Sequence, residues 1–268
     1  MSASNLSDQV VLVTRPVDQQ QPLSSAIEQA GGTVLAKPLI SITPLQQQSQ
    51  QGQASLMSKI RDLGNYQLLI FVSSNAARFG ARLISDNWPE FPEGVQLMAI
   101  GPSTAAVVED LLECRAFMPG SGMSSEDLLE LEQLKQLEGM KIAIVRGKGG
   151  RELLARSLEA RGAEVDYLEV YERQPINYES AEFCDSLRQS GTTVMTVTSG
   201  ESLEVLASLL ISGDNKQEFS LLPLLVPSER VAQLAEEAGF ANVFSCRGAD
   251  TESMIQGLQS ITADGRLS

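Results

Sequence analysis

The most constraining feature of this sequence is an internal repeat. Residues 10–44 and residues 141–175 align without a gap at an offset of 131 residues. The alignment places Arg146 on Arg15. It also preserves the apolar face of the helix that we expect within each stretch. A repeat of this length predicts that most of the chain consists of two copies of one folding unit.

Each repeated stretch has the pattern of a strand, a helix and a second strand. In the second copy, residues 142–146 predict a buried strand, Leu154 and Leu158 lie four apart on one helix face, and Gly162 ends the helix. A strand–helix–strand unit implies two parallel strands joined by a right-handed crossover. The sequence therefore predicts an α/β protein with parallel sheets.

Two further blocks extend the duplication beyond the C-terminal end of each repeated stretch. FVSSNAARFGARL matches VTSGESLEVLASL at an offset of 126, and IGPSTAAVVE matches VPSERVAQLA at an offset of about 125. The second match places Ser103 on Ser228. A chain of 268 residues is also long enough for two domains, so we expect one domain for each copy.

Composition limits the chemistry that this chain can perform. The absence of histidine excludes His-based triads, imidazole metal ligands and the usual general base near neutral pH. The net charge of −14 disfavours nonspecific binding to nucleic acid or to anionic membranes. We expect no signal peptide, because residues 1–9 are polar, and no membrane span, because no run reaches roughly 18–20 continuous apolar residues. Three widely separated cysteines favour a reducing cytoplasm and no zinc site.

Small hydroxyl residues, glycines and arginines recur where predicted strands end and predicted helices begin. Such positions suit carboxylates or phosphates, because backbone N–H groups, the helix dipole and a guanidinium can act together there. The alternative is that these residues only cap helices, and that the arginines only form surface salt bridges. The candidate binding residues are Arg15, Ser73, Ser74, Gly101, Ser103, Thr104, Arg146, Thr198, Ser199, Gly200 and Ser228.

The glycine-rich segment RGKGGRE at residues 146–152 does not have the spacing of a nucleotide-binding loop. It fits neither the G-x-x-x-x-G-K-[ST] pattern nor G-x-G-x-x-G, so we expect no NAD or ATP site. The G-x-S-x-G elbow of serine hydrolases is also missing.

Tyr171 distinguishes the second copy from the first. Its counterpart, 131 residues earlier, is Ile40, so the fold accepts an aliphatic side chain at this position. The tyrosine hydroxyl is therefore an addition that the scaffold does not require. The alternative interpretation is a half-buried aromatic residue that only packs on its strand.

The chain resembles the uroporphyrinogen-III synthase family in an ordered set of blocks within residues 10–259. These blocks are VLVTRP, LLIFVSSNAARFG, AIGPSTAA, FMPGSGMSSEDLL, IAIVRGKGGRELLARSLEARGAEVDYLEVYERQP, VTSGESL and VPSERVAQLAEEAG. The resemblance implies two flavodoxin-like three-layer α/β domains with parallel sheets, joined by a two-stranded antiparallel linker. It further implies that residues 1–39 and 173–268 form one discontinuous domain and residues 40–172 the other. By itself, the sequence equally allows two sequential domains.

The same resemblance implies a cofactor-free lyase of tetrapyrrole synthesis. Its substrate would be hydroxymethylbilane, a linear tetrapyrrole that carries many carboxylates. The enzyme would remove the terminal hydroxyl as water, invert the last pyrrole ring through a spiro intermediate, and close the macrocycle. Since this substrate also cyclises unaided to the wrong isomer, the protein mainly has to hold it in the correct conformation. A chain without histidine can do that.

The resemblance also assigns roles to individual residues. Tyr171 would help the hydroxyl to leave, and the strand-end residues would bind the acetate and propionate arms. Arg15 and Arg146 would supply positive charge, with Lys148 and Arg151 as weaker candidates. The expected protein is a cytoplasmic monomer without cofactor or metal, and it receives its substrate from hydroxymethylbilane synthase.

Two other functions remain open from the sequence. One is a two-lobed binding protein or sensor that closes on an anionic small molecule without chemistry. The other is a regulator that is derived from the synthase fold and has lost its activity.

Overall fold

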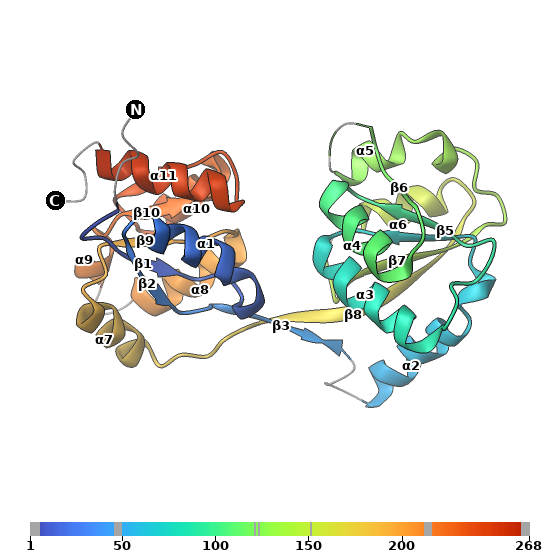
Figure 1. The fold of residues 1–268 in the computed structure, drawn as a ribbon, viewed down its shortest axis with the longest axis horizontal. Helices are drawn as coiled ribbons and strands as arrows, with labels where there is room; N and C mark the ends of the chain where they lie inside the picture. The colour runs from blue at the N-terminus through green and yellow to red at the C-terminus, as the bar shows by residue number, and fades with distance from the viewer. Residues whose placement is uncertain are drawn as a thin grey trace. The chain divides into compact units, whose positions relative to one another are not determined.

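The computed structural model describes residues 6–45, 50–120, 122, 124–150, 152–211 and 216–263, and the chain divides into two compact units (Figure 1). Unit 1 comprises residues 1–41 and 174–268, and unit 2 comprises residues 42–173. The chain therefore passes from one unit to the other twice, at residues 41–42 and at residues 173–174.

Unit 1 is organised around a five-stranded sheet with the order β11-β10-β9-β1-β2. All of its neighbouring strands are parallel. Numbered along unit 1 alone, the strands have the order 2-1-3-4-5, which is the flavodoxin-like arrangement. The strands are β1 (Val10–Val13), β2 (Thr33–Ala36), β9 (Val194–Thr196), β10 (Leu224–Val226) and β11 (Val243–Ser245).

Unit 2 contains a six-stranded sheet with the order β3-β8-β7-β4-β5-β6, in which the last five strands are parallel to one another. Counted from β7, these five strands again have the order 2-1-3-4-5. The strands are β3 (Ile40–Pro44), β4 (Leu68–Phe71), β5 (Gln96–Ala99), β6 (Ala116–Phe117), β7 (Lys141–Gly147) and β8 (Glu164–Pro175). The prediction of two flavodoxin-like α/β sheets is confirmed.

The strands β3 and β8 run in opposite directions. The Ile176 N–H donates to the Leu39 carbonyl at 2.8 Å, and the Ser41 hydroxyl donates to the Gln174 carbonyl at 3.1 Å. From Leu39 to Ser41 the residue number rises by two, while that of the partner falls by two, from Ile176 to Gln174. This is the pattern of antiparallel strands. The long strand β8 thus belongs to the parallel sheet of unit 2 and extends along β3 (Figure 1).

The two copies of the repeat exchange their halves. Unit 1 combines β1 and β2 of the first copy with β9, β10 and β11 of the second. Unit 2 combines β7 and β8 of the second copy with β4, β5 and β6 of the first. Residues that are far apart in the sequence therefore share a sheet edge.

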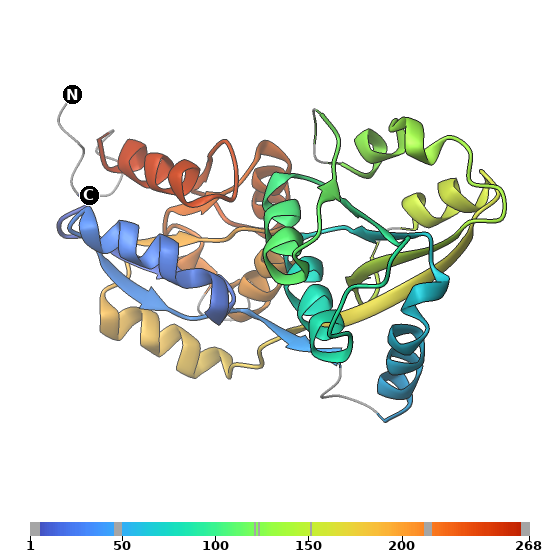
Figure 2. The same ribbon diagram turned by 45° about the vertical axis from the view of Figure 1, so that its right-hand side comes forward.

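Helices cover both faces of each sheet (Figures 1 and 2). In unit 1, α1 and α11 pack on one face, and α7, α8 and α10 on the other. In unit 2, α2, α3 and α4 pack on one face, and α5 and α6 on the other. This double cover explains the continuous apolar strands, because both faces of a parallel sheet lie in the core. The helices are α1 (Val17–Gln29), α2 (Gln50–Arg61), α3 (Ser74–Asn87), α4 (Pro102–Leu112), α5 (Ser125–Leu129), α6 (Leu153–Glu159), α7 (Ser180–Ser190), α8 (Gly200–Leu210), α9 (Lys216–Phe219), α10 (Glu229–Ala238) and α11 (Thr251–Ala263).

The sequence pattern was misleading in the glutamine-rich segment, for which it predicts a solvent-exposed loop over residues 46–53. Residues 46–49 lie outside the described residues, but α2 already begins at Gln50. Glutamine is a good helix former, and the buried Leu56 and Ile60, four residues apart, hold this helix against the sheet.

Within the described part of the chain, no helix combines the length and the apolar character that crossing a bilayer requires. No group of three or more acidic or cysteine side chains in this part could hold a metal ion.

Candidate functional site

The predicted site residues lie at the carboxyl ends of the parallel strands, where open α/β sheets bind ligands. They form two groups, one in each unit. In unit 2 they follow or end β4, β5, β7 and β8, and in unit 1 they follow β1, β9 and β10. The unit 2 group is Ser73, Ser74, Gly101, Ser103, Thr104, Arg146 and Tyr171; the unit 1 group is Arg15, Thr198, Ser199, Gly200 and Ser228.

Tyr171 is buried, with 4% of its surface exposed, and its hydroxyl lies at the carboxyl edge of the unit 2 sheet. The phenol oxygen is 3.4 Å from the Ser73 hydroxyl oxygen. Its ring stacks on Phe79, with centroids 5.6 Å apart, and the Arg173 guanidinium lies 5.8 Å from the ring centroid. The phenol is therefore held by packing on α3, and its polar end meets the first residue before that helix.

Ser73 connects Tyr171 to the N-terminus of α3. The Ser73 hydroxyl is the N-cap of α3 and accepts a hydrogen bond from the Ala76 N–H at 3.0 Å. Because one lone pair of this oxygen is occupied by an N–H donor, its own proton is free to be donated to the Tyr171 oxygen. When Ser73 is the donor of this contact, the phenolic proton of Tyr171 is not used in it.

The N-termini of α3 and α4 lie side by side. The hydroxyl oxygens of Ser74 and Ser103 are 3.2 Å apart, and both side chains are exposed. The N-cap of α4 is Gly101, which has no side chain to cap the helix. Free N–H groups at such an end attract anions. Thr104, by contrast, is buried with 2% exposure, so its hydroxyl does not face solvent.

Helix geometry corrects one detail of the repeat alignment. The sequence match pairs Ser103 with Ser228, but Ser228 is the N-cap of α10, whereas the N-cap of α4 is Gly101. In both helices the N-cap carbonyl accepts from the residues three and four positions later. Gly101 and Ser228 are thus the structural equivalents. The sequence alignment is displaced by two residues here, because it superposes the Pro-Ser pair of one block on the Pro-Ser pair of the other.

In unit 1, Ser199 and Ser228 are helix caps. Ser199 accepts from the Ser202 N–H at 3.1 Å, and Ser228 accepts from the Val231 N–H at 3.4 Å. Thr198 and Gly200, on either side of Ser199, are half-buried. These two serines and Ser73 therefore do cap their helices. Each cap binds one N–H group, and the other N–H groups of the first turn remain available to a ligand.

Among the predicted residues, Arg15 has a buried hydrogen-bond donor without a partner in the described structure. Burial lowers the pKa of its guanidinium, while the nearby charge of Asp250 opposes that effect. One terminal nitrogen donates to the Ala249 carbonyl. The Nε atom is buried and has no hydrogen-bond partner in the described structure. An unpaired buried donor costs about 1–3 kcal/mol, which a bound carboxylate would offset.

The other basic candidates already have partners. Arg146 is buried, its guanidinium lies 4.7 Å from the Tyr167 ring centroid, and its Nε donates to the Gly147 carbonyl at 3.1 Å. Lys148 pairs with Glu172 at 3.0 Å. Arg151 lies outside the described residues. Arg146 and Lys148 therefore already have partners, whereas Arg15 keeps one buried donor without a partner in the described structure.

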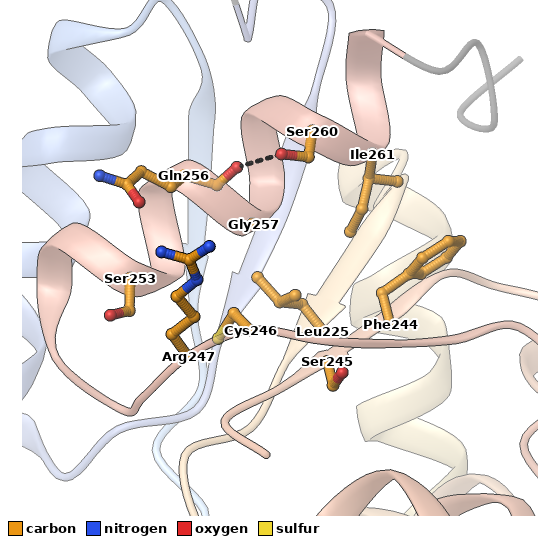
Figure 3. A pocket seen from close by; sticks show the side chains of 10 residues that line it. All are labelled: Leu225, Phe244, Ser245, Cys246, Arg247, Ser253, Gln256, Gly257, Ser260 and Ile261. Carbon is orange, nitrogen blue, oxygen red and sulfur yellow. Dashed lines mark hydrogen bonds between the residues drawn. The ribbon is translucent and has the colours of Figure 1, made fainter. Parts of the chain in front are cut away.

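None of the predicted residues lines a cavity of about 340 Å³ between β11 and α11 (Figure 3). The Cys246 thiol in its wall is partly buried, and this desolvation raises the pKa of the thiol and makes it a poor nucleophile near neutral pH. A second cavity, of about 590 Å³, adjoins the first turn of α4 and is lined by Pro102, Arg115 and Phe117 among others.

Sequence reasoning missed two residues that shape the surroundings of Tyr171. Phe79 had no signal beyond an apolar position in a helix. Gly147 had a signal, as a glycine directly after a buried strand, but the sequence suggested only a turn there.

Known proteins resemble this chain along nearly its whole length. A family model described as uroporphyrinogen-III synthase HemD matches residues 21–256. The uroporphyrinogen-III synthase of Escherichia coli (strain K12) is 34% identical over 252 residues, which cover 93% of this chain and 99% of that protein. A solved mutant uroporphyrinogen III synthase from the extremely thermophilic bacterium Thermus thermophilus has a TM-score of 0.60 at 16% identity, with 97% and 99% of the two chains covered. The uroporphyrinogen-III synthetase from Helicobacter pylori 26695 has a TM-score of 0.58 at 15% identity, with 94% and 99% covered. At these identities, the two solved structures support the fold alone.

Proposed function

The chain belongs to the uroporphyrinogen-III synthase family, and on that premise we propose that it cyclises hydroxymethylbilane to uroporphyrinogen III, with loss of water and inversion of the terminal pyrrole ring. The observation that carries this proposal is the match to a synthase along 93% of the chain. The contact of Tyr171 with the N-cap of α3, whose N-terminus adjoins that of α4, supports it, because the substrate combines a leaving hydroxyl with many carboxylates.

The strand-end residues bind and bend the substrate. In unit 2, carboxylate arms accept hydrogen bonds from the first-turn N–H groups of α3 and α4, where the helix dipole also favours negative charge. In unit 1, the first turns of α8 and α10 offer donors of the same kind. The buried Nε of Arg15 donates to one further carboxylate. Several such anchors fix the linear substrate in a conformation that places its two ends together, which reduces the entropic part of the barrier.

Tyr171 handles the proton that the reaction requires. Its hydroxyl donates a proton to the terminal hydroxyl of the substrate while the carbon–oxygen bond breaks, and the leaving group departs as water. The resulting cationic carbon is attacked by the terminal pyrrole ring, and the ring inverts through a spiro intermediate before the macrocycle closes. Closure releases one proton from carbon, which returns to the Tyr171 oxygen. One water is produced and the protein is unchanged.

An isomer assay tests the proposal directly. Hydroxymethylbilane is generated in situ, the purified protein is added, and the oxidised products are separated into type I and type III uroporphyrin. We expect the protein to change the product from the spontaneous type I isomer to predominantly type III. Formation of type I alone, at the spontaneous rate, would contradict the proposal.

Four finer features belong to the same proposal: a lyase reaction without cofactor, a monomeric state, a cytoplasmic location and transfer of the substrate from hydroxymethylbilane synthase. The three cysteines are free thiols, which supports a reducing compartment. Size-exclusion chromatography with light scattering tests the monomer, and an elution mass of two chains would contradict it.

A two-lobed sensor without chemistry is not favoured, since the family model and the similar curated proteins carry the name of the synthase.

A further inference from the structure

Gly147 leaves the space that the Tyr171 phenol occupies. A Cβ atom on Gly147 would lie 2.6 Å from two ring carbons of Tyr171, Cε2 and Cζ, and 3.0 Å from its hydroxyl oxygen. Contacts under about 3.0 Å do not occur between a real Cβ and a neighbouring heavy atom, so one of the two residues would have to move. Tyr171 cannot move away freely, because the Phe79 ring stacks against its ring, with the two ring centroids 5.6 Å apart.

A strand irregularity brings this pair together. Along β7 and β8, Arg146 lies opposite Glu169, but Gly147 lies opposite Tyr171, so that Val170 is an extra residue on β8. Without the bulge, Gly147 would pair with Val170 and the tyrosine would point to the other face of the sheet. The Lys148 N–H then donates to the Tyr171 carbonyl at 2.8 Å, which fixes the register after the bulge.

The first copy of the repeat lacks both members of the pair. Where the second copy has Gly147 and Tyr171, the first has Pro16 and Ile40, each 131 residues earlier. The serine that faces the phenol does have a counterpart, since Ser199 caps α8 as Ser73 caps α3. The fold thus requires the serine cap in both units, whereas the glycine and the tyrosine occur together only in unit 2.

We propose that Gly147 is a positioning residue for the reaction, whose missing side chain lets the Tyr171 hydroxyl reach the leaving hydroxyl of a linear tetrapyrrole. Gly147 touches the phenol and acts through it. The inference rests on the proposed function, because it assumes that Tyr171 donates the proton. A methyl group at residue 147 displaces the phenol by a substantial fraction of an ångström while all carboxylate-binding groups remain in place.

The test compares Gly147→Ala in two backgrounds. In the wild type we expect kcat for type III product to fall about 100-fold, since a displacement near 1 Å can cost that much, with KM changed less than about 3-fold. In the Tyr171→Phe background, the same change should lower kcat less than about 2-fold further, because the hydroxyl is already gone. In spectra of carbon-labelled tyrosine, the Tyr171 resonance should shift while that of Tyr178, in unit 1, stays unchanged.

Gly257→Ala is the matched control for overpacking. A Cβ there would lie 2.9 Å from Leu225 in unit 1, so it creates a similar overlap without touching Tyr171. It should lower the melting temperature to a comparable degree and leave kcat per folded molecule unchanged. Should Gly147→Ala fail to fold, Phe79→Leu loosens the same phenol without any overlap, and its kcat should fall about 10-fold at an unchanged KM.

The outcomes separate the inference from the proposed function. Full kcat in folded Gly147→Ala, full kcat in Phe79→Leu, or equal losses with and without the Tyr171 hydroxyl would overturn the positioning role alone. If Tyr171→Phe kept full turnover, the catalytic role of Tyr171 and the positioning role would both be wrong. The isomer assay on the wild-type protein tests the synthase activity independently of either result.

Discussion

Replacement of Arg15 by methionine should separate substrate binding from stability. The substitution keeps an unbranched apolar stem of similar length and removes the guanidinium. The guanidinium makes one hydrogen bond to the Ala249 carbonyl, and its buried Nε has no partner in the described structure. These two facts have opposite consequences for the free energy of folding.

The two effects on stability nearly cancel. Loss of the hydrogen bond to Ala249 costs about 1.5–3 kcal/mol, because the donor is charged. Relief of the unpaired buried Nε returns about 1–3 kcal/mol. We therefore expect the free energy of unfolding of Arg15→Met to lie within about 1 kcal/mol of the wild-type value. Substrate binding has no such compensation, since the carboxylate loses a charged donor worth about 1.5–3 kcal/mol, or roughly a 10- to 150-fold fall in kcat/KM.

The assay measures unfolding and turnover on the same protein. Urea unfolding is followed by circular dichroism, because the single tryptophan, Trp88, reports on unit 2 and Arg15 lies in unit 1. The control is Arg188→Met, which removes the same charge from an exposed cluster with Asp185 and Glu218. It should leave kcat/KM unchanged. A loss of more than about 2 kcal/mol in Arg15→Met, with full kcat/KM, would show that Arg15 only fastens the loop around Ala249 and would refute the binding role.

Three further predictions follow from the same structure. Tyr171→Phe should lower kcat at least about 100-fold with little change in unfolding free energy, because among the described residues the hydroxyl makes only the 3.4 Å contact to Ser73; unchanged turnover would remove it from the mechanism. Burial would raise the pKa of Asp166, but hydrogen bonds from Tyr66 and Lys59 lower it overall, so this carboxylate stabilises the fold above about pH 4 and loses that effect as the pH falls further. Asp166→Asn should accordingly lower the urea midpoint at pH 7 and leave it unchanged near pH 2, and equal losses at both values would contradict this. Dialysis against a chelator should leave the type III activity intact, and recovery of lost activity by an added metal would overturn the cofactor-free proposal.

Much of the fold could be predicted from residues close together in the sequence. The continuous apolar runs identify the buried strands β1, β4 and β7, because a strand covered on both faces shows no alternation. Serines directly after such runs identify the starts of α3 and α8, and both serines cap their helices as expected. The prediction for the glutamine-rich start of α2 was wrong, because a polar composition does not exclude a helix that buries one narrow face.

The candidate site was harder to predict than the fold. Strand ends can be recognised in a sequence, so Arg15 and Tyr171 could be named. The exposure of each side chain could not be inferred, and Thr104 turned out to be buried while Ser103 is exposed. The burial of the Arg15 Nε without a partner depends on the position of the loop at Ala249. No pattern of neighbouring residues predicts that position.

By itself, the sequence determined that the protein is a duplicated α/β chain with a tyrosine in only one copy. The tertiary structure decided how the copies combine. The apolar edge of β1 could pair with β4 of its own copy or with β9 of the other, since both are short, apolar and parallel-compatible, and β9 is the partner. That exchange brings Ser73 of the first copy to Tyr171 of the second, 98 residues apart. The bulge at Val170 and the space above Gly147 arise only once the strands are paired, because register is a property of two strands and not of either one alone.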